Sequence, residues 1–299
     1  MANATNTMNT IAEPLAPVDS NPVTDLFRDT ATLYRRAILK MFRVPAQLYF
    51  SLVQPLIWFL LFGQLFSRLT SGFGAIPPGA PNPVTAQFGT DNYEAFFLPA
   101  IIIQVLLFGA ASSALGIIND DQSGYLNKLR VSPINRIAIL IGGLLADLTR
   151  MLLQVVVLLL VGFIFGVRFQ YAALIPLIFV IAALFGLMMG GLGLFVGLTT
   201  RNTQATFLII NFFTLPLLFT STAQLPMKFL PDWLQVVSRY NPVTYAVNSI
   251  RVIVTGLNQQ QISDGQTVSG IIFLGLGVLL VLTVIALGVA TLRFRKQVQ

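Results

Sequence analysis

The residues of this chain that could do chemistry are concentrated in one polar segment, residues 119–136, which reads NDDQSGYLNKLRVSPINR. Five charged side chains lie in it: Asp120, Asp121, Lys128, Arg130 and Arg136. A simple reversal of the chain between two helices needs far fewer residues. Carboxylates and cations at this density can form charge-assisted hydrogen bonds with another protein and set its register. The segment therefore predicts a docking site for a partner outside the membrane.

Most other reaction chemistry is excluded by composition. The chain has no cysteine and no histidine, so disulfides, thiolate nucleophiles, zinc sites of the usual kind and imidazole catalysis are excluded. A membrane enzyme acting on lipid remains a weak alternative, because Ser112 and Ser113 have no visible general base. We expect no catalytic residue and no cofactor or metal site in this chain.

The elements that must position the polar segment are strongly apolar. Hydrophobic residues make up 55% of the chain and charged residues 10%, with a mean hydropathy of +0.78, against about 25% charged residues in soluble domains. A helical span needs about 20 apolar residues. The sequence therefore predicts an all-α integral membrane protein with six transmembrane helices. They are expected at about residues 45–66, 95–118, 137–166, 172–199, 205–223 and 268–292.

Two different segments precede the first span. Residues 1–23 are rich in Asn, Thr, Ala and Pro and contain no basic residue, which predicts a disordered tail. Residues 24–44 alternate apolar and charged faces with helical periodicity, which predicts an amphipathic interfacial helix. This helix could anchor the chain to the lipid surface, dock a cytoplasmic partner, or do both. Its candidate docking residues are Arg36, Lys40 and Arg43.

Residues 224–267, before the last span, contain two short amphipathic stretches separated by Asn and Pro. The second stretch, from Val243 to Leu257, is too short to cross a bilayer and carries Arg251. Counting it as a span would also place the basic C-terminal residues on the outer side. We therefore expect outer re-entrant helices here, with residues 45–299 forming one transmembrane domain.

The net charge of +7 is explained by membrane topology. With a cytoplasmic N-terminus, twelve of the eighteen basic residues lie in inner segments, as the positive-inside rule requires. They are Arg28, Arg35, Arg36, Lys40, Arg43, Lys128, Arg130, Arg136, Arg201, Arg293, Arg295 and Lys296. We therefore expect a multi-pass protein of the cytoplasmic (inner) membrane with both termini in the cytoplasm, in contact with membrane lipid and not with nucleic acid.

Several polar residues fall inside the predicted spans. Asp147 and Arg150 are three residues apart, so they can pair on one helix face, either as an interfacial pair with Arg150 extended to the headgroups or as a functional intramembrane charge. Uncharged residues could hydrogen-bond between helices or line a substrate route. They are Gln54, Gln104, Gln154 and Asn211. Glycines 186, 190, 193 and 197 leave one helix side bare and predict close helix packing.

No nucleotide-binding loop is present. The fingerprint GxxxxGK[ST] needs a Gly-Lys pair, and the four lysines follow Leu39, Asn127, Met227 and Arg295. A secondary transporter would be expected to carry intramembrane acids or an internal repeat, and neither is evident away from the inner interface. The sequence favours transport driven by a partner, with a motor-independent channel or a secondary transporter as the alternative.

Two motifs resemble one known family. The run from Asp120 to Arg136 is similar to the acidic, Gly, Leu-Arg, Ser/Thr-Pro, Arg pattern of ABC-2-type transporter permeases. The run Leu230–Leu234, followed by Asn241–Tyr245 and Arg251, is similar to the outer segment before the last span of that family. The order and spacing most resemble the drug-resistance and lipo-oligosaccharide export branch. One departure is that Asn-Asp-Asp stands where the family has a Glu-rich run.

The resemblance implies a permease subunit of an ATP-binding-cassette exporter that moves an amphiphile such as a drug, lipid or glycolipid. It implies two permease chains, identical or related, with two cytoplasmic subunits that bind ATP-Mg. It also implies a coupling helix within residues 119–131 that docks into the ATPase. The docking residues implied there are Asp120, Asp121, Gly124, Tyr125, Leu126, Lys128, Leu129 and Arg130. Trp233, Tyr240 and Tyr245 would be aromatic contacts at the exit, unless they form an ordinary interfacial belt.

Overall fold

The computed structural model describes residues 22–43, 45–71, 88, 90, 93–124, 136–257 and 264–298, and every element in these ranges is helical. This confirms the all-α class. The long helices are α1 (Pro22–Arg43), α2 (Pro45–Ser71), α4 (Tyr93–Gln122), α6 (Arg136–Ile164), α7 (Ile175–Thr200), α8 (Thr203–Phe219) and α12 (Val268–Val298). The short elements are η1 (Ala172–Leu174), η2 (Met227–Phe229), α9 (Asp232–Tyr240) and α10 (Pro242–Thr255).

Among the described residues, four helices are long and apolar enough to cross a membrane: Tyr93–Gln122, Ile137–Ile164, Ala172–Thr200 and Val268–Lys296. The first and fifth predicted spans contain shorter apolar helices, Ser51–Leu65 and Thr203–Phe219. The chain is therefore a multi-pass membrane protein. The expected fifth helix was too long, because α8 ends at Phe219 and the hydroxyl-rich residues after it bond elsewhere: Ser221 Oγ donates to Leu218 O, and the Thr222 amide donates to Thr244 Oγ1.

Helix α4 is the centre of the bundle. Its apolar window is 72% buried inside the protein, whereas the windows of the other three long helices are 28% to 39% buried. It packs against α2, α6, α7, α8 and α10. Because α4 runs as one helix from Tyr93 to Gln122, the first residues of the predicted coupling segment are a continuation of a span.

The glycine stripe of α7 packs against α4, as the sequence predicts. A Cβ atom added at Gly193 would meet the backbone carbonyl of Ala110, and one at Gly197 would lie 3.0 Å from the carbonyl oxygen of Ala114. On a different face, a Cβ at Gly191 would lie 3.2 Å from the backbone of Ala286 in α12. Glycine is needed at these positions because helix backbones approach each other closely.

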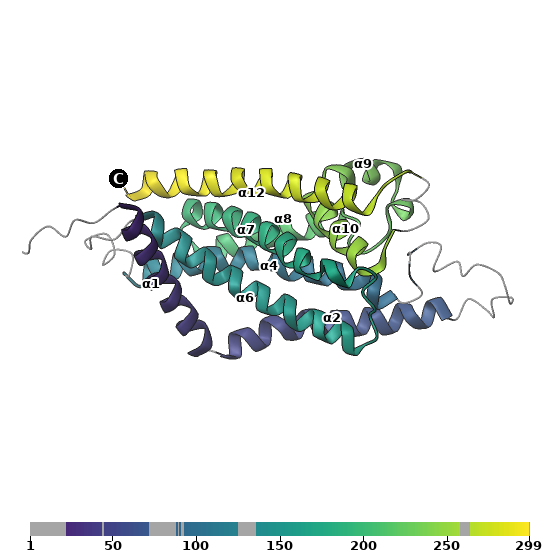
Figure 1. Ribbon diagram of the computed structural model, residues 1–299. Coiled ribbons are helices and arrows are strands. Elements are labelled where there is room, and N and C mark those ends of the chain that lie inside the picture. Colours follow the sequence, from purple (N-terminus) through teal and green to yellow (C-terminus); the bar gives the residue numbers. More distant parts are fainter. Residues whose placement is uncertain are drawn as a thin grey trace, which may run out of the picture.

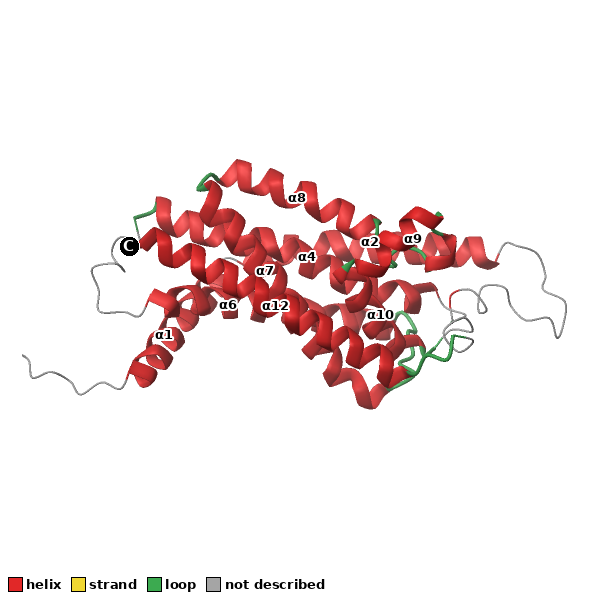
Figure 2. Cartoon of the chain, turned by 90° about the horizontal axis from the view of Figure 1, so that it is seen from above, coloured by secondary structure: helices red, strands yellow, loops and turns green. Residues whose placement is uncertain are grey.

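The bundle has two distinct ends (Figures 1 and 2). The α1 end carries α1, the C-terminal ends of α4 and α12, and the turn at Arg201 and Asn202 between α7 and α8. The α10 end carries α9 and α10. All the described segments predicted to be cytoplasmic therefore lie together, and the segment 224–257 lies at the opposite end.

Helix α10 covers the second of the two stretches that were expected to be re-entrant. Six of its residues are fully buried inside the bundle: Val243, Ala246, Val247, Ile250, Ile253 and Val254. They pack against α4, α7 and α12. The amphipathic pattern of this helix reflects packing inside the bundle more than contact with a membrane surface.

Candidate functional site

Helix α1 is attached to α6 by close backbone packing. A Cβ atom at Gly142 would lie 2.9 Å from the Cβ atom of Leu33 and 3.3 Å from the carbonyl oxygen of Thr30, so glycine permits an approach that any side chain here would widen. A hydrogen bond of 3.1 Å joins Tyr34 Oη and Thr149 Oγ1 across the same contact. Helix α1 ends at Arg43, and α2 begins at Pro45 in a different direction (Figure 1). The predicted amphipathic helix is therefore held on the bundle and does more than lie on lipid.

The described part of the predicted coupling segment begins as helix. Asp120 and Asp121 lie in the last turn of α4, where a carboxylate opposes the helix dipole. The chain leaves the helix at Gly124, whose φ of 69° suits glycine. The Gly124 amide donates to Asp121 O at 3.0 Å. The remaining predicted docking residues of this segment lie outside the described residues, namely Tyr125, Leu126, Lys128, Leu129 and Arg130.

A cavity of about 350 Å³ lies between α1, α4 and α6, and Leu194 of α7 also lines it. Two of the predicted docking residues of α1, Arg36 and Lys40, line it together with Asp120 of α4. Arg43, the third, is exposed at the end of α1 and does not line it. The structure therefore brings part of the predicted docking set together around a space that the sequence did not predict.

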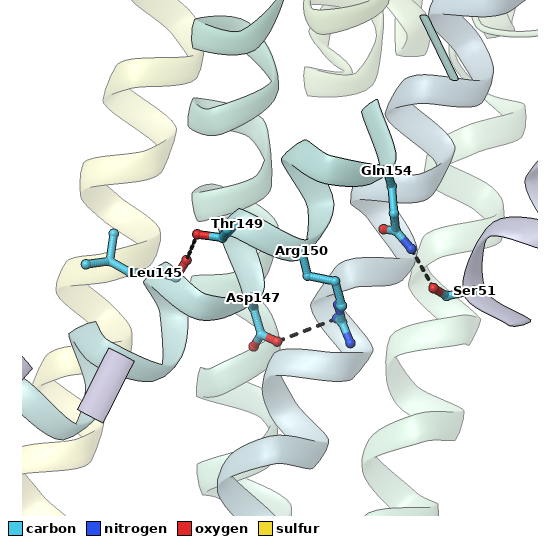
Figure 3. Close-up of polar contacts among 6 residues, drawn as sticks. All are labelled: Ser51, Leu145, Asp147, Thr149, Arg150 and Gln154. Atoms are coloured by element: carbon cyan, nitrogen blue, oxygen red, sulfur yellow. Dashed lines mark hydrogen bonds and ion pairs between the residues drawn. The ribbon is translucent and has the colours of Figure 1, made fainter. Parts of the chain in front are cut away.

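The predicted pair of Asp147 and Arg150 is formed in α6 (Figure 3), and both residues line this cavity. Arg150 Nη2 lies 3.5 Å from Asp147 Oδ1, which is longer than a strong charge-assisted hydrogen bond. Arg150 is only 9% exposed, so it does not extend to the surface as a snorkelling side chain would. The spacing of three residues puts both side chains on one face of α6, and the packing of α6 against α1 and α4 encloses that face.

The predicted polar route residues are dispersed among four helices. Gln154 of α6 is buried and donates a hydrogen bond of 2.6 Å to Ser51 Oγ of α2 (Figure 3), which supports a structural role. Gln104 is buried in α4, whereas Gln54 is exposed on α2. Asn211 donates to the carbonyl of Phe207 within α8. Their place in a substrate route stays a prediction.

The predicted aromatic contacts lie at the α10 end. Trp233 and Tyr240 of α9 are 68% and 82% exposed, and Tyr245 of α10 is half-buried. Exposed aromatic rings at one end of a membrane bundle suit both an interfacial belt and a binding surface. Their role as exit contacts stays a prediction.

Arg251 is a residue whose importance was missed. It is 8% exposed in α10, and its guanidinium donates to the carbonyl oxygens of Phe96, Thr222 and Ala223 at 3.3, 2.9 and 3.1 Å. The guanidinium carbon also lies 3.9 Å from the centre of the Phe96 ring. Arg251 thus ties α10 to α4 and to the turn after α8. The available signal was an arginine in a stretch with no other charged residue, but it served only as an argument against a membrane span and as part of the family motif.

Asn241 explains the Asn-Pro motif at the start of α10. It caps α10 by accepting from the Val243 amide at 2.9 Å, and its Nδ2 donates to the carbonyl of Leu217 at 2.7 Å. Pro242 follows at the first helical position, where its missing amide costs nothing. The Asn-Pro motif is therefore a helix start fastened to the end of α8.

Comparison with known proteins identifies a family for this chain. The ABC-2 type transporter family matches residues 28–255. A putative transport permease ycf38 from Cyanophora paradoxa is 31% identical, over 78% of this chain and 77% of that protein. Its counterpart from Porphyra purpurea is 29% identical, over 84% and 86%. The daunorubicin resistance ABC transporter permease protein DrrB1 from Streptomyces coeruleorubidus is 24% identical, over 76% and 75%.

Proposed function

This chain belongs to the ABC-2 type transporter family and is a membrane permease subunit of an ABC exporter, and from this premise we propose that a separate ATPase drives it through the α1 end. The ATPase binds ATP-Mg, since the chain itself has no nucleotide-binding loop. Two permease chains, identical or related, work with two ATPase subunits. The cargo is an amphiphile such as a drug, a lipid or a glycolipid.

The orientation we propose places the α1 end and both termini in the cytoplasm of the cell, with the protein in the inner membrane. The support is the clustering at this end of basic residues in α1, in the turn at Arg201 and at the end of α12. The six-span arrangement, with α2 and α8 as the additional spans and α9 and α10 as a re-entrant pair, is part of the same proposal.

The observation that carries the coupling mechanism is the continuity of α4. Its 30 residues extend roughly 45 Å at about 1.5 Å per residue, from the polar segment to the α10 end. At the far end, Phe96 of α4 accepts a hydrogen bond from Arg251. ATPase closure pushes residues 119–136 and α1, and α4 transmits this displacement to α10 and the turn after α8. The permeation route then opens along the interface between two permease chains.

Replacing Leu126 and Leu129 together with Asp tests the docking surface, because it puts charge into the predicted apolar anchor. We expect ATP-dependent transport and stimulation of the ATPase by the permease to fall by at least about tenfold, equivalent to about 1.4 kcal/mol of coupling. In proteoliposomes, substrate-dependent ATPase activity measures the stimulation, and cargo efflux measures the transport.

The matched control is Leu225→Asp, which places the same charge on a 38% exposed leucine at the opposite end. It should leave ATPase stimulation unchanged. If the double variant inserts into the membrane normally and still couples transport to the ATPase, residues 119–136 are not the docking site. Cargo flux without any ATPase would instead support the channel alternative.

A further inference from the structure

The cavity at the α1 end has features of a binding site that the coupling mechanism does not use. Its volume of about 350 Å³ lies in the range of ligand pockets, roughly 300–1,000 Å³. Helices α1, α4 and α6 each contribute both polar and apolar side chains to its lining. A cavity with such a lining suits a ligand that has one polar part and one apolar part.

Its buried polar groups are incompletely satisfied. Arg150 Nε and Ser113 Oγ are buried atoms that make no hydrogen bond within the described part of the chain. Arg150 is 9% and Ser113 3% exposed. Ser113 faces Asp147, but without hydrogen-bonding geometry. Buried polar atoms are usually paired, so an unused guanidinium N–H beside a cavity indicates an acceptor that comes from outside the chain.

The charges of the lining favour an anion. The lining holds the cations of Arg36, Lys40 and Arg150 and the carboxylates of Asp120 and Asp147. Arginine binds phosphate and carboxylate oxygens through several N–H groups at once, and Arg150 Nε has no acceptor within the described part of the chain. An anionic oxygen group of a ligand would supply the acceptor that Arg150 lacks.

The rest of the lining is hydrocarbon. Apolar side chains from all four contributing helices surround the polar groups: Ala37, Met41, Leu115, Ile117, Ile139, Leu140, Leu144 and Leu194. Helix α1 is amphipathic and packs at this end of the bundle, which places the cavity beside the level of the lipid headgroups. A free inorganic anion would leave this apolar surface uncovered.

We propose that the cavity between α1, α4 and α6 binds an anionic amphiphile, with its phosphate or carboxylate group on Arg150, Lys40 and Ser113 and its hydrocarbon against the apolar lining. Binding belongs to the permease chain itself, so it goes beyond the proposed function and needs neither ATP nor the ATPase.

The direct test measures lipid binding to the purified full-length chain without its ATPase. Native mass spectrometry in detergent compares dioleoyl phosphatidylglycerol with dioleoyl phosphatidylcholine, which has the same hydrocarbon but no net charge. We expect the phosphatidylglycerol to bind at least about tenfold more tightly. Inorganic phosphate is the competing probe, and an excess of it should not displace the lipid.

Two variants locate the binding. Arg150→Gln removes the buried cation, and Gly143→Leu fills the cavity without removing any charge, because a Cβ atom at Gly143 meets nothing within 4 Å. Each should weaken phosphatidylglycerol binding by about tenfold or more. Gly277→Leu is the control, since Gly277 of α12 is also exposed and unobstructed but lies outside the cavity.

The proposal is overturned if both lipids bind equally, or if Gly143→Leu binds phosphatidylglycerol as well as the natural chain does. It is also overturned if inorganic phosphate displaces the lipid, since the cavity would then be a site for a free anion. Arg150→Gln can impair folding, but Gly143→Leu leaves every polar contact in place and remains informative on its own.

Discussion

Arg251 shows how one buried cation can organise an end of this protein. Its guanidinium uses its N–H groups on backbone carbonyls of α4 and of the turn after α8, with the Phe96 ring beneath it. A lysine has no planar set of donors for three separate carbonyls. The contact between α4 and α10 therefore depends on arginine chemistry at this position.

Arg251→Gln is expected to lower the free energy of unfolding by about 3 kcal/mol, because three buried carbonyl groups lose a charged donor. The thermal unfolding midpoint of the detergent-purified protein measures the loss. Arg239→Gln is the control, since Arg239 is exposed in α9, and it should change stability by less than about 0.5 kcal/mol. Equal stability of both variants would show that the hydrogen bonds of Arg251 do not stabilise the contact between α10 and α4.

The pairing of Asp147 with Arg150 was predictable from their spacing, but its surroundings were not. The interval of three residues places the two side chains on one helix face whatever the helix packs against. Which face turns to α4, and that Arg150 retains an unpaired Nε there, depends on helices brought together by the fold. The same holds for Gln154, whose partner Ser51 is 103 residues away in the chain.

At the scale of elements, glycine decides which helices can touch. Gly193 in α7 and Gly142 in α6 allow backbone contact with α4 and α1, respectively. Gly143, the next residue along α6, meets no neighbour within 4 Å. These adjacent glycines of one helix therefore have different roles: Gly142 makes a packing contact, and Gly143 lines the cavity.

Gly193→Val should disrupt the contact between α7 and α4, because its side chain would overlap the Ala110 backbone, which cannot move aside as a flexible side chain can. We expect a loss of about 3 kcal/mol or more in stability, at the upper end for overpacked cores. Gly288→Val in α12 is the matched control, because a Cβ atom there meets nothing. Thermal unfolding compares the two, and similar midpoints would contradict the packing.

The attachment of α1 to α6 can be tested by disulfide formation, since the natural chain has no cysteine. Leu33→Cys with Gly142→Cys places the two Cβ atoms 2.9 Å apart before relaxation, and a small shift brings them into the disulfide range of about 3.5–4.5 Å. We expect cross-linking on mild oxidation, with ATP-dependent transport retained because α1 and α6 move as one unit.

The control pair, Leu33→Cys with Gly143→Cys, should not cross-link, because Gly143 has no contact with Leu33. A shift in electrophoretic mobility under non-reducing conditions reports the disulfide. Loss of transport in the cross-linked protein, with recovery on reduction, would show instead that α1 moves against α6 during the cycle.

At the scale of the whole molecule, the lateral surface of the bundle is apolar and the charged residues lie at its two ends. Helices α8 and α12 expose large apolar side chains along their length, including Phe207, Phe212, Phe213, Phe273, Leu280 and Ile285. Such continuous surface suits hydrocarbon, or a second permease chain within it. The proposed orientation of the bundle rests on the basic residues at the α1 end.

Orientation is testable with single cysteines in right-side-out membrane vesicles. Asp232→Cys, exposed in α9 at the α10 end, should react with a membrane-impermeant thiol reagent. Arg201→Cys, exposed in the turn between α7 and α8, should react only after the vesicles are permeabilised. The reverse pattern would place the α1 end outside the cell and end the proposed coupling mechanism.

The sequence by itself determined the all-α membrane class, the positions of the helices to within a few residues, the family resemblance and the close packing of α7. These follow from composition, helical periodicity and local motifs, which are properties of neighbouring residues. Only the tertiary structure decided that α10 is buried, that Arg251 joins three elements and that Arg36, Lys40 and Arg150 share a cavity. Such contacts join residues far apart in the chain, and no local pattern specifies which helix faces meet.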